Sequence, residues 1–228
     1  MNQERTRRRL PRGEREQQII DCAIQVFARR GYSAASVDEI AELAGVSKPL
    51  VYLYLESKEG LFLACLHREE QRLVGAFHGA AEAAGQTSEL RLWAGLQAFF
   101  GFVSDHGDSW AVLHRQAPDL GATIAEEISR ARRAVLDEVR TLVIEGIALS
   151  PGPAHLGDTD ADFVAHALVG AADSLTDWME RHPDESPDRV TLRLMGMMWV
   201  GMRQVLGGEV WVPPGASLGL ADGVMGRT

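Results

Sequence analysis

The chain has 228 residues, of which 46% are apolar and 24% charged, and its formal net charge is −9. It is long enough to bury a substantial core as one domain or two small ones, and its total charge does not suggest a nucleic-acid partner. The charge is unevenly distributed, however. Residues 1–66 carry ten basic and nine acidic side chains, whereas residues 67–228 carry 13 and 23. An anionic partner would therefore meet strong repulsion everywhere except in the N-terminal quarter.

The first 15 residues form an arginine-rich segment that contains six arginines. No apolar segment with a small-residue cleavage site follows it, as a secretion signal would require. No apolar run reaches the roughly 18–20 residues that span a bilayer. The two cysteines, Cys22 and Cys65, have no CxxC spacing and are expected to be buried free thiols in a reducing compartment. We therefore expect a cytoplasmic protein without a membrane segment.

Apolar residues recur with a helical period along most of the chain, and strand-like alternation is not sustained, which predicts an all-α fold. The first amphipathic helix is expected from Glu14 to Gly31. Ser36 and Glu39 have the spacing of a capping box for a short helix that ends at Ala44, before Gly45.

Two further serines are suited to begin helices. Ser47 can cap a second short helix, with Pro49 tolerated in its first turn. Ser57 can cap a third helix, which runs from Lys58 to about Ala84. Longer helices are then predicted at about 89–105, 108–117, 120–149, 160–182 and 187–206. The last 22 residues contain six glycines and two prolines, which predicts a flexible tail at 207–228.

Two short helices joined by a glycine-containing turn have the arrangement of a helix-turn-helix. Val51 and Leu55 can seal the inner side of the second helix, while Lys48 and Tyr52, with Leu50 nearby, project outward. A lysine can bind guanine O6 and N7 or a phosphate, and a leucine can contact a thymine methyl group, so this surface suits a major groove.

Both lysines of the chain, Lys48 and Lys58, lie in this region, and Tyr54 and Lys58 are placed where a DNA backbone would pass. Hydroxyl groups, ammonium groups and the amides of a helix N-terminus all bind phosphate. The alternative is that the tyrosines are core residues and that the two lysines coincide by chance.

The stretch SVDEIAELAGVSKPLVYLYLESKEGLF (36–62), preceded by IIDCAIQVFARRGY (19–32), resembles the DNA-binding region of TetR-type transcriptional repressors. The sequence departs mildly from the family pattern, with Leu55 where phenylalanine is usual and Val51 where leucine or isoleucine is usual. The resemblance implies phosphate contacts at the start of the first short helix, base contacts from the second, and backbone contacts after it. The DNA-binding candidates are Ser36, Val37, Ser47, Lys48, Pro49, Leu50, Tyr52, Tyr54 and Lys58.

The resemblance implies a helix-turn-helix domain at 16–66, preceded by a disordered arm at 1–15 that contacts phosphate or the minor groove or is simply a solvated tail. Residues 67–206 would form a helical effector-binding and dimerisation domain. Its dimer would pair the helices at 160–182 and 187–206, although the Met-rich second helix could equally be buried inside one subunit. Such a dimer would bind double-stranded DNA at a palindromic operator.

An aromatic cluster is expected on helices that line the effector cavity in similar proteins, and it suggests a small apolar or aromatic effector. These ligand-binding candidates are Trp93, Phe99, Phe100, Trp110, His114 and Trp178. An aromatic stripe at helical spacing can also be plain core. The histidines show no HxxxH pair, and we expect no metal, no cofactor and no enzymatic activity.

The overall hypothesis is a dimeric repressor that a small effector releases from its operator. The alternative is a small all-α carrier of lipids or other small molecules, or an enzyme, without DNA binding.

Overall fold

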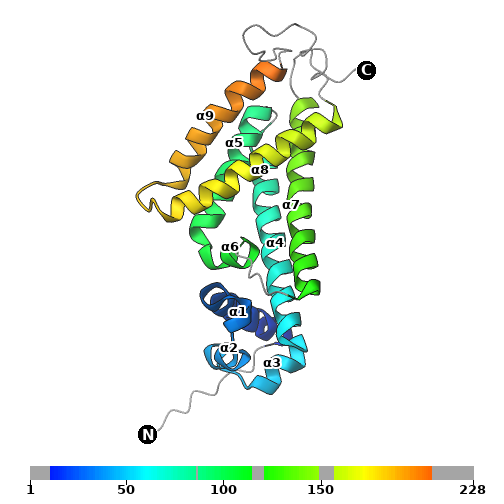
Figure 1. The fold of residues 1–228 in the computed structure, drawn as a ribbon, viewed down its shortest axis with the longest axis vertical. Helices are drawn as coiled ribbons and strands as arrows, with labels where there is room; N and C mark the ends of the chain where they lie inside the picture. The colour runs from blue at the N-terminus through cyan, green and yellow to red at the C-terminus, as the bar shows by residue number, and fades with distance from the viewer. Residues whose placement is uncertain (1–10, 86, 115–120, 149–156, 207–228) are drawn as a thin grey trace. The chain divides into compact units, whose positions relative to one another are not determined.

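The computed structural model describes residues 11–85, 87–114, 121–148 and 157–206, and in these ranges the regular structure is entirely helical (Figure 1). The predicted all-α fold is confirmed. Residues 1–10 of the predicted arm and the whole predicted tail lie outside the described residues. The helices are α1 (Arg12–Ala34), α2 (Val37–Ala44), α3 (Lys48–Leu55), α4 (Lys58–Ala83), α5 (Ser88–Asp105), α6 (Gly107–His114), α7 (Ala122–Ala148), α8 (Asp158–Glu180) and α9 (Pro187–Leu206).

The chain divides into two compact units, and the chain passes between them inside α4, between α5 and α6, and inside α7. The first unit takes in the chain up to Glu70 together with Gly107–Ala131, and the second takes in the rest. A single boundary at residue 66 was expected from the sequence. Helix α6 and the start of α7 join the first unit because Val112, Ile124 and Ile128 are buried in its core.

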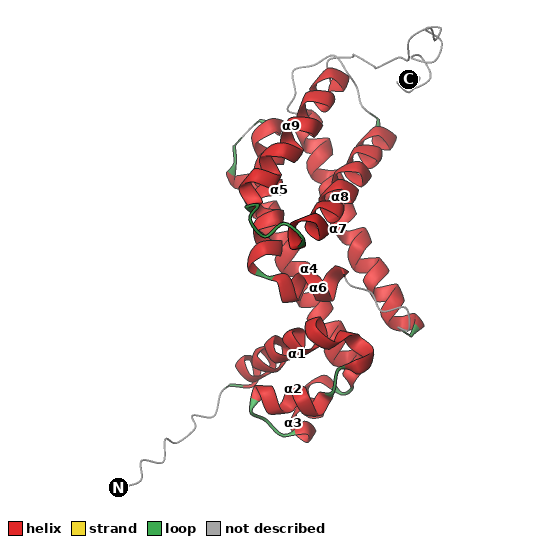
Figure 2. Cartoon of the chain, turned by 60° about the vertical axis from the view of Figure 1, so that its left-hand side comes forward, coloured by secondary structure: helices red, strands yellow, loops and turns green. Residues whose placement is uncertain are grey.

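In the first unit, α2 packs against both α1 and α3 (Figures 1 and 2). The core side of α1 carries the apolar residues that the helical period predicted, among them Ile20, Ala23, Ile24 and Phe27. Helical backbone angles are interrupted at Gly31, and α1 continues for three residues beyond the predicted end.

An aromatic group joins the end of α1 to the start of α4. Phe62 meets Phe27 and Tyr32 edge to face, with ring centroids 5.1 Å apart in each pair. This packing fixes the beginning of α4 next to the helix-turn-helix.

In the second unit, α5 packs against α8 and α9 around an apolar cluster. Within the described residues, no helix is long and apolar enough to cross a membrane. The buried members of the cluster are Leu96, Phe100, Ala172, Val190, Leu194 and Met195.

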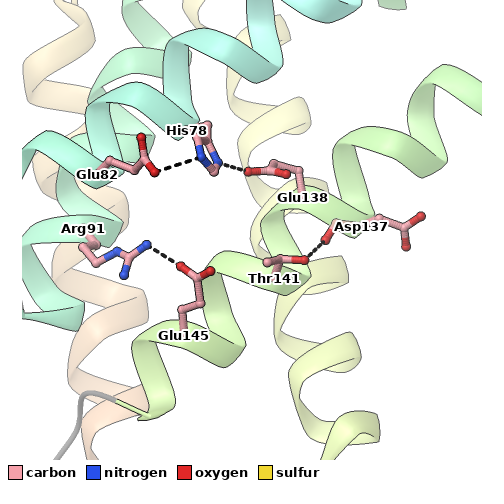
Figure 3. Close-up of polar contacts among 7 residues, drawn as sticks. All are labelled: His78, Glu82, Arg91, Asp137, Glu138, Thr141 and Glu145. Carbon is pink, nitrogen blue, oxygen red and sulfur yellow. Dashed lines mark hydrogen bonds and ion pairs between the residues drawn. The ribbon is translucent and has the colours of Figure 1, made fainter.

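Polar contacts join α7 to α4 and α5 within this unit (Figure 3). His78 of α4 bonds to Glu138 of α7 and lies 3.3 Å from Glu82, while Arg91 of α5 pairs with Glu145. The hydrogen bond and charge of Glu138, followed by the charge of Glu82, raise the pKa of His78. The contact of His78 with Glu138 therefore links α4 to α7, and it favours the charged form of the imidazole.

Candidate nucleic-acid interface

Helix α2 is capped by Ser36 and ends at a glycine turn, as predicted. The hydroxyl oxygen of Ser36 accepts a hydrogen bond from the amide of Asp38 at 3.2 Å. The expected capping box does not form: Glu39 pairs with Arg30 at 3.6 Å, and Ser36 caps the helix alone. Gly45 adopts a left-handed conformation, φ 63°, and its amide is bonded to the last turn of α2. Glycine suits this position because it reaches positive φ without steric cost.

Helix α3 has one buried side and one exposed side. Val51 is 1% exposed and Leu55 is 8% exposed, which places both in the core of the first unit as predicted. Leu50 is half-buried. The outward side chains are Ser47, Lys48, Pro49, Tyr52 and Leu53.

Leu53 is the outward residue that the sequence did not single out. It is 71% exposed, compared with 38% for Tyr52. Leu53 is an apolar residue between two tyrosines, so nothing in the sequence marked it as a DNA contact. Its exposure depends on how α3 is rotated about its own axis. An exposed leucine next to Tyr52 in the chain adds apolar surface to the candidate interface.

The junction between α3 and α4 is tight. The amide of Gly60 donates to the hydroxyl oxygen of Ser57 at 2.9 Å, which confirms the predicted cap. A Cβ atom on Gly60 would lie only 2.6 Å from the carbonyl oxygen of Leu55. Glu56, between the helices, is the one non-glycine residue with positive φ in the described part of the chain. The start of α4 is therefore held close to the end of α3.

The two predicted backbone contacts, Lys58 and Tyr54, both have partners within the first unit. The ammonium of Lys58 donates to the carbonyl oxygen of Ser33 at 3.1 Å and lies 4.7 Å from the centre of the Tyr32 ring. Burial lowers the pKa of Lys58. The half-buried ring of Tyr54 lies 5.4 Å from the guanidinium of Arg12. Arg12 falls within the segment predicted to be a disordered arm, yet it begins α1.

Lys48 also has a partner. Its ammonium donates to a carboxylate oxygen of Asp38 at 2.8 Å, and the two side chains are 44% and 69% exposed. The hydrogen bond and charge of Asp38 raise the pKa of Lys48. Asp38 was not among the predicted interface residues, because its contact with Lys48 depends on the crossing of α2 and α3 and has no fixed sequence spacing.

At the N-terminus of α2, the capping residue Ser36 is exposed, whereas the side chain of Val37, the first helical residue, is 6% exposed. Val37 can therefore meet DNA only through its backbone. Its amide is one of those that a helix N-terminus leaves without an intrahelical partner. The two neighbouring residues thus offer a hydroxyl and an amide to an anion.

The predicted ligand-binding residues divide between the two units. Phe100 is fully buried in the apolar cluster of the second unit, and Trp93, Phe99 and Trp178 pack around it. Trp110 and His114 belong to the first unit and stack on each other with centroids 4.7 Å apart. The four aromatic residues of the second unit therefore lie together, whereas Trp110 and His114 belong to a different unit.

The chain matches two families along most of its length. Residues 19–65 match bacterial regulatory proteins of the tetR family, and residues 89–201 match the tetracyclin repressor-like C-terminal domain. The chain is 31% identical over 198 residues to the HTH-type transcriptional activator FasR of Mycolicibacterium smegmatis. That match covers 86% of this chain and 87% of FasR.

Solved structures agree with this relationship. A TetR-like transcriptional regulator from Rhodococcus sp. RHA1 is 34% identical, with a TM-score of 0.69 over 86% of this chain and 99% of the other. FadR from Bacillus subtilis, in complex with stearoyl-CoA, is 18% identical and shares the fold, with a TM-score of 0.69 over 80% and 96%. The chain therefore belongs to the tetR family of bacterial regulatory proteins and is a ligand-responsive, DNA-binding transcriptional regulator.

Proposed function

We propose that the chain binds a palindromic operator as a homodimer, with α3 of each subunit in the major groove, and that a small apolar effector releases it. The observation that carries this proposal is the two-sided character of α3. Val51 and Leu55 anchor the helix from behind, and Lys48, Tyr52 and Leu53 project outward. An ammonium, a phenol and an aliphatic side chain are groups that suit base edges in a major groove.

The residues around α3 would position the helix on the duplex. The hydroxyl of Ser36 accepts from Asp38 but can still donate its own hydrogen to a phosphate, and the Val37 amide can donate beside it. Tyr54 and Lys58 would contact the backbone at the other end of α3, since Lys58 has ammonium hydrogens beyond the one bonded to Ser33. Pro49 and Leu50 would lie at the groove by their place on α3, and Ser47 by its place immediately before that helix.

The proposed dimer uses α8 and α9, within the second unit. One side of α9 is buried in the apolar cluster through Val190, Leu194 and Met195. Phe163 of α8 and Leu192, Met197 and Val200 of α9 are between 50% and 73% exposed. Several exposed large apolar residues on two helices are typical of a surface that a protein partner covers. A symmetric pair would present two copies of α3 about 34–36 Å apart, or a multiple of that distance, to two half-sites.

The effector would bind the second unit beside its apolar cluster. Trp93, Phe99 and Trp178 surround this cluster, and their large apolar surfaces favour a lipophilic ligand. FadR from Bacillus subtilis was solved with stearoyl-CoA, so we propose an acyl chain as the apolar group. Trp110 and His114 are left out of this proposed site because they belong to the first unit.

The sign of regulation stays a prediction. The sequence favoured a repressor, whereas the relative FasR is named an activator. The same operator contacts serve either role, because the position of the operator relative to a promoter decides whether a bound protein blocks or assists transcription. Likewise, a cytoplasmic location and the absence of catalysis remain expectations.

Selection from a pool of randomised duplexes tests DNA binding directly. The purified chain should enrich an inverted repeat, with protection of two half-sites on one side of the duplex. A carrier or enzyme without DNA binding would enrich nothing, and the proposal would then fail.

Dimerisation is tested by Met197→Glu, with Leu90→Glu as the matched control. Leu90 lies on α5 and is also exposed, at 50%. A charge buried without a partner disfavours an interface, so the Met197 variant should become monomeric in light scattering and lose tight operator binding. The Leu90 variant should stay dimeric. Equal behaviour of the two variants would refute the proposed interface.

The effector is tested with fatty acids of increasing chain length and their coenzyme A thioesters. A binding compound should raise the melting temperature and weaken operator binding, because it must prefer the conformer with low DNA affinity. If no acyl compound does either, the proposed ligand class is wrong.

A further inference from the structure

The two helices of the helix-turn-helix are acidic. Between Val37 and Leu55 the chain has three carboxylates, Asp38, Glu39 and Glu42, and a single basic residue, Lys48. Non-specific binding to DNA comes almost entirely from cations that neutralise phosphates. Helices α2 and α3 thus have little to offer a phosphate backbone by charge, and their one cation is already bonded to a carboxylate.

The geometry of this pair is well defined by the backbone at both ends. Asp38 stands in the first turn of α2, with its amide bonded to the hydroxyl oxygen of Ser36. Lys48 begins α3, which the turn at Gly45 joins to α2. The distance of 2.8 Å between the ammonium nitrogen and the carboxylate oxygen is that of a charge-assisted hydrogen bond.

We propose that Asp38 is a specificity-determining residue: it fixes the ammonium of Lys48 in place and prevents it from binding phosphates of any sequence. The proposal rests on the function proposed above, in which α3 lies in the major groove. Asp38 acts as an internal counterion, so a phosphate that approaches Lys48 must displace a carboxylate that is already bound. Contact of this neutralised lysine with a phosphate then releases few counterions from the DNA and adds little affinity.

A base edge is a different partner for the same pair. The ammonium has three hydrogens, so it can bond to Asp38 and still donate to guanine O6 or N7. The exposed carboxylate can in turn accept from the amino group of a cytosine. The pair is thus compatible with base readout and opposes phosphate binding, which is the combination that raises the ratio of specific to non-specific affinity.

Asp38→Asn is the decisive variant, because it keeps the size and the acceptor oxygen of the side chain and removes the charge. Glu42→Gln is its control, since it removes the same charge from another exposed residue of α2. The full-length protein is titrated, over a range of salt concentrations, with the duplex found by selection and with a scrambled duplex of equal length. Circular dichroism and melting curves verify that each variant is folded.

For the scrambled duplex, Asp38→Asn should steepen the dependence of log K on log salt by about 0.9, the contribution of one more phosphate contact. If the variant and the unaltered chain bind equally at about 1 M salt, this slope corresponds to roughly eightfold tighter binding of the variant at about 0.1 M salt. The gain on the selected duplex should be smaller, so the specificity ratio falls. Glu42→Gln should leave the salt slope unchanged.

Lys48→Ala supplies a second, independent measurement. It should leave the salt slope for the scrambled duplex unchanged in the natural chain, where Asp38 already neutralises the lysine. In the Asp38→Asn background it should remove the added slope of about 0.9.

Two results would overturn the inference. One is an Asp38→Asn variant that behaves like Glu42→Gln on both duplexes. The other is a Lys48→Ala variant that flattens the slope equally with and without Asp38. If the unaltered chain still selects and binds an operator, either result refutes only the role of Asp38 and leaves the proposed function standing. Failure of the natural chain to select any operator would instead refute the proposed function.

Discussion

Replacement of Val51 by alanine, paired with replacement of Leu53, tests which side of α3 faces the protein. Val51 is 1% exposed, so Val51→Ala removes the equivalent of two buried methylene groups, worth about 0.8 kcal/mol each. A residual cavity of roughly 40 Å³ would add about 1 kcal/mol. The free energy of unfolding of the first unit should therefore fall by about 2–3 kcal/mol. Leu53 is 71% exposed, and Leu53→Ala should change this free energy by less than about 0.5 kcal/mol.

DNA binding should respond in the opposite order. Leu53→Ala should weaken operator binding at a temperature where both variants are folded, because an apolar contact in the groove is lost. Val51→Ala should bind the operator nearly normally while it remains folded. Urea denaturation followed by circular dichroism gives the stabilities, and fluorescence anisotropy gives the affinities. A stable Val51 variant together with a destabilised Leu53 variant would mean that α3 is rotated from the orientation described, and the proposed interface would be wrong.

Two further predictions concern charged groups. Lys58→Met should weaken binding to the selected and scrambled duplexes alike and flatten the salt slope by about 0.9. It should also lower the melting temperature, because the contacts of the ammonium with Ser33 and Tyr32 are lost; an unchanged slope would remove Lys58 from the phosphate contacts. The folded-state pKa of His78 is raised, chiefly by Glu138, so its stabilising contribution is complete below the unfolded value of about 6.5 and is lost as the pH rises through the folded value. The melting temperature should therefore fall over that range in the natural chain and fall less in His78→Gln, and parallel curves for the two proteins would contradict the assigned cause.

Local rules were sufficient to predict the elements of the DNA-binding region. The apolar period of α1, the caps at Ser36 and Ser57, and Gly45 each act over a few residues, so their effect can be deduced without knowledge of the rest of the fold. Ser47 precedes α3 as predicted, but its side chain makes no capping hydrogen bond. The division of α3 into a core side and an outward side followed from the spacing of Val51 and Leu55 alone. Glu39 shows the limit of such rules, since it pairs with Arg30 of α1 and the expected capping box does not form.

Features that depend on distant segments could not be predicted in the same way. Helix α6 reads as one more amphipathic segment, yet its burial with Ile124 and Ile128 places it in the first unit. Trp110 and His114 were consequently grouped with aromatic residues of the second unit on the basis of sequence proximity. Helical period shows that a residue has an apolar neighbour, but it does not identify the segment that supplies the neighbour.

The two lysines illustrate how environment separates residues that look alike in sequence. Lys48 is exposed and bonded to a carboxylate, whereas Lys58 is half-buried against a carbonyl oxygen and an aromatic ring. A carbonyl oxygen and a ring face leave the positive charge of Lys58 unneutralised, and it remains available to attract phosphate. A carboxylate neutralises Lys48, which can therefore contribute to DNA binding chiefly through directed hydrogen bonds from its ammonium group to base edges. The general affinity for DNA should therefore depend on Lys58 and the choice of sequence on Lys48, which is the division of roles that their places in the helix-turn-helix predicted.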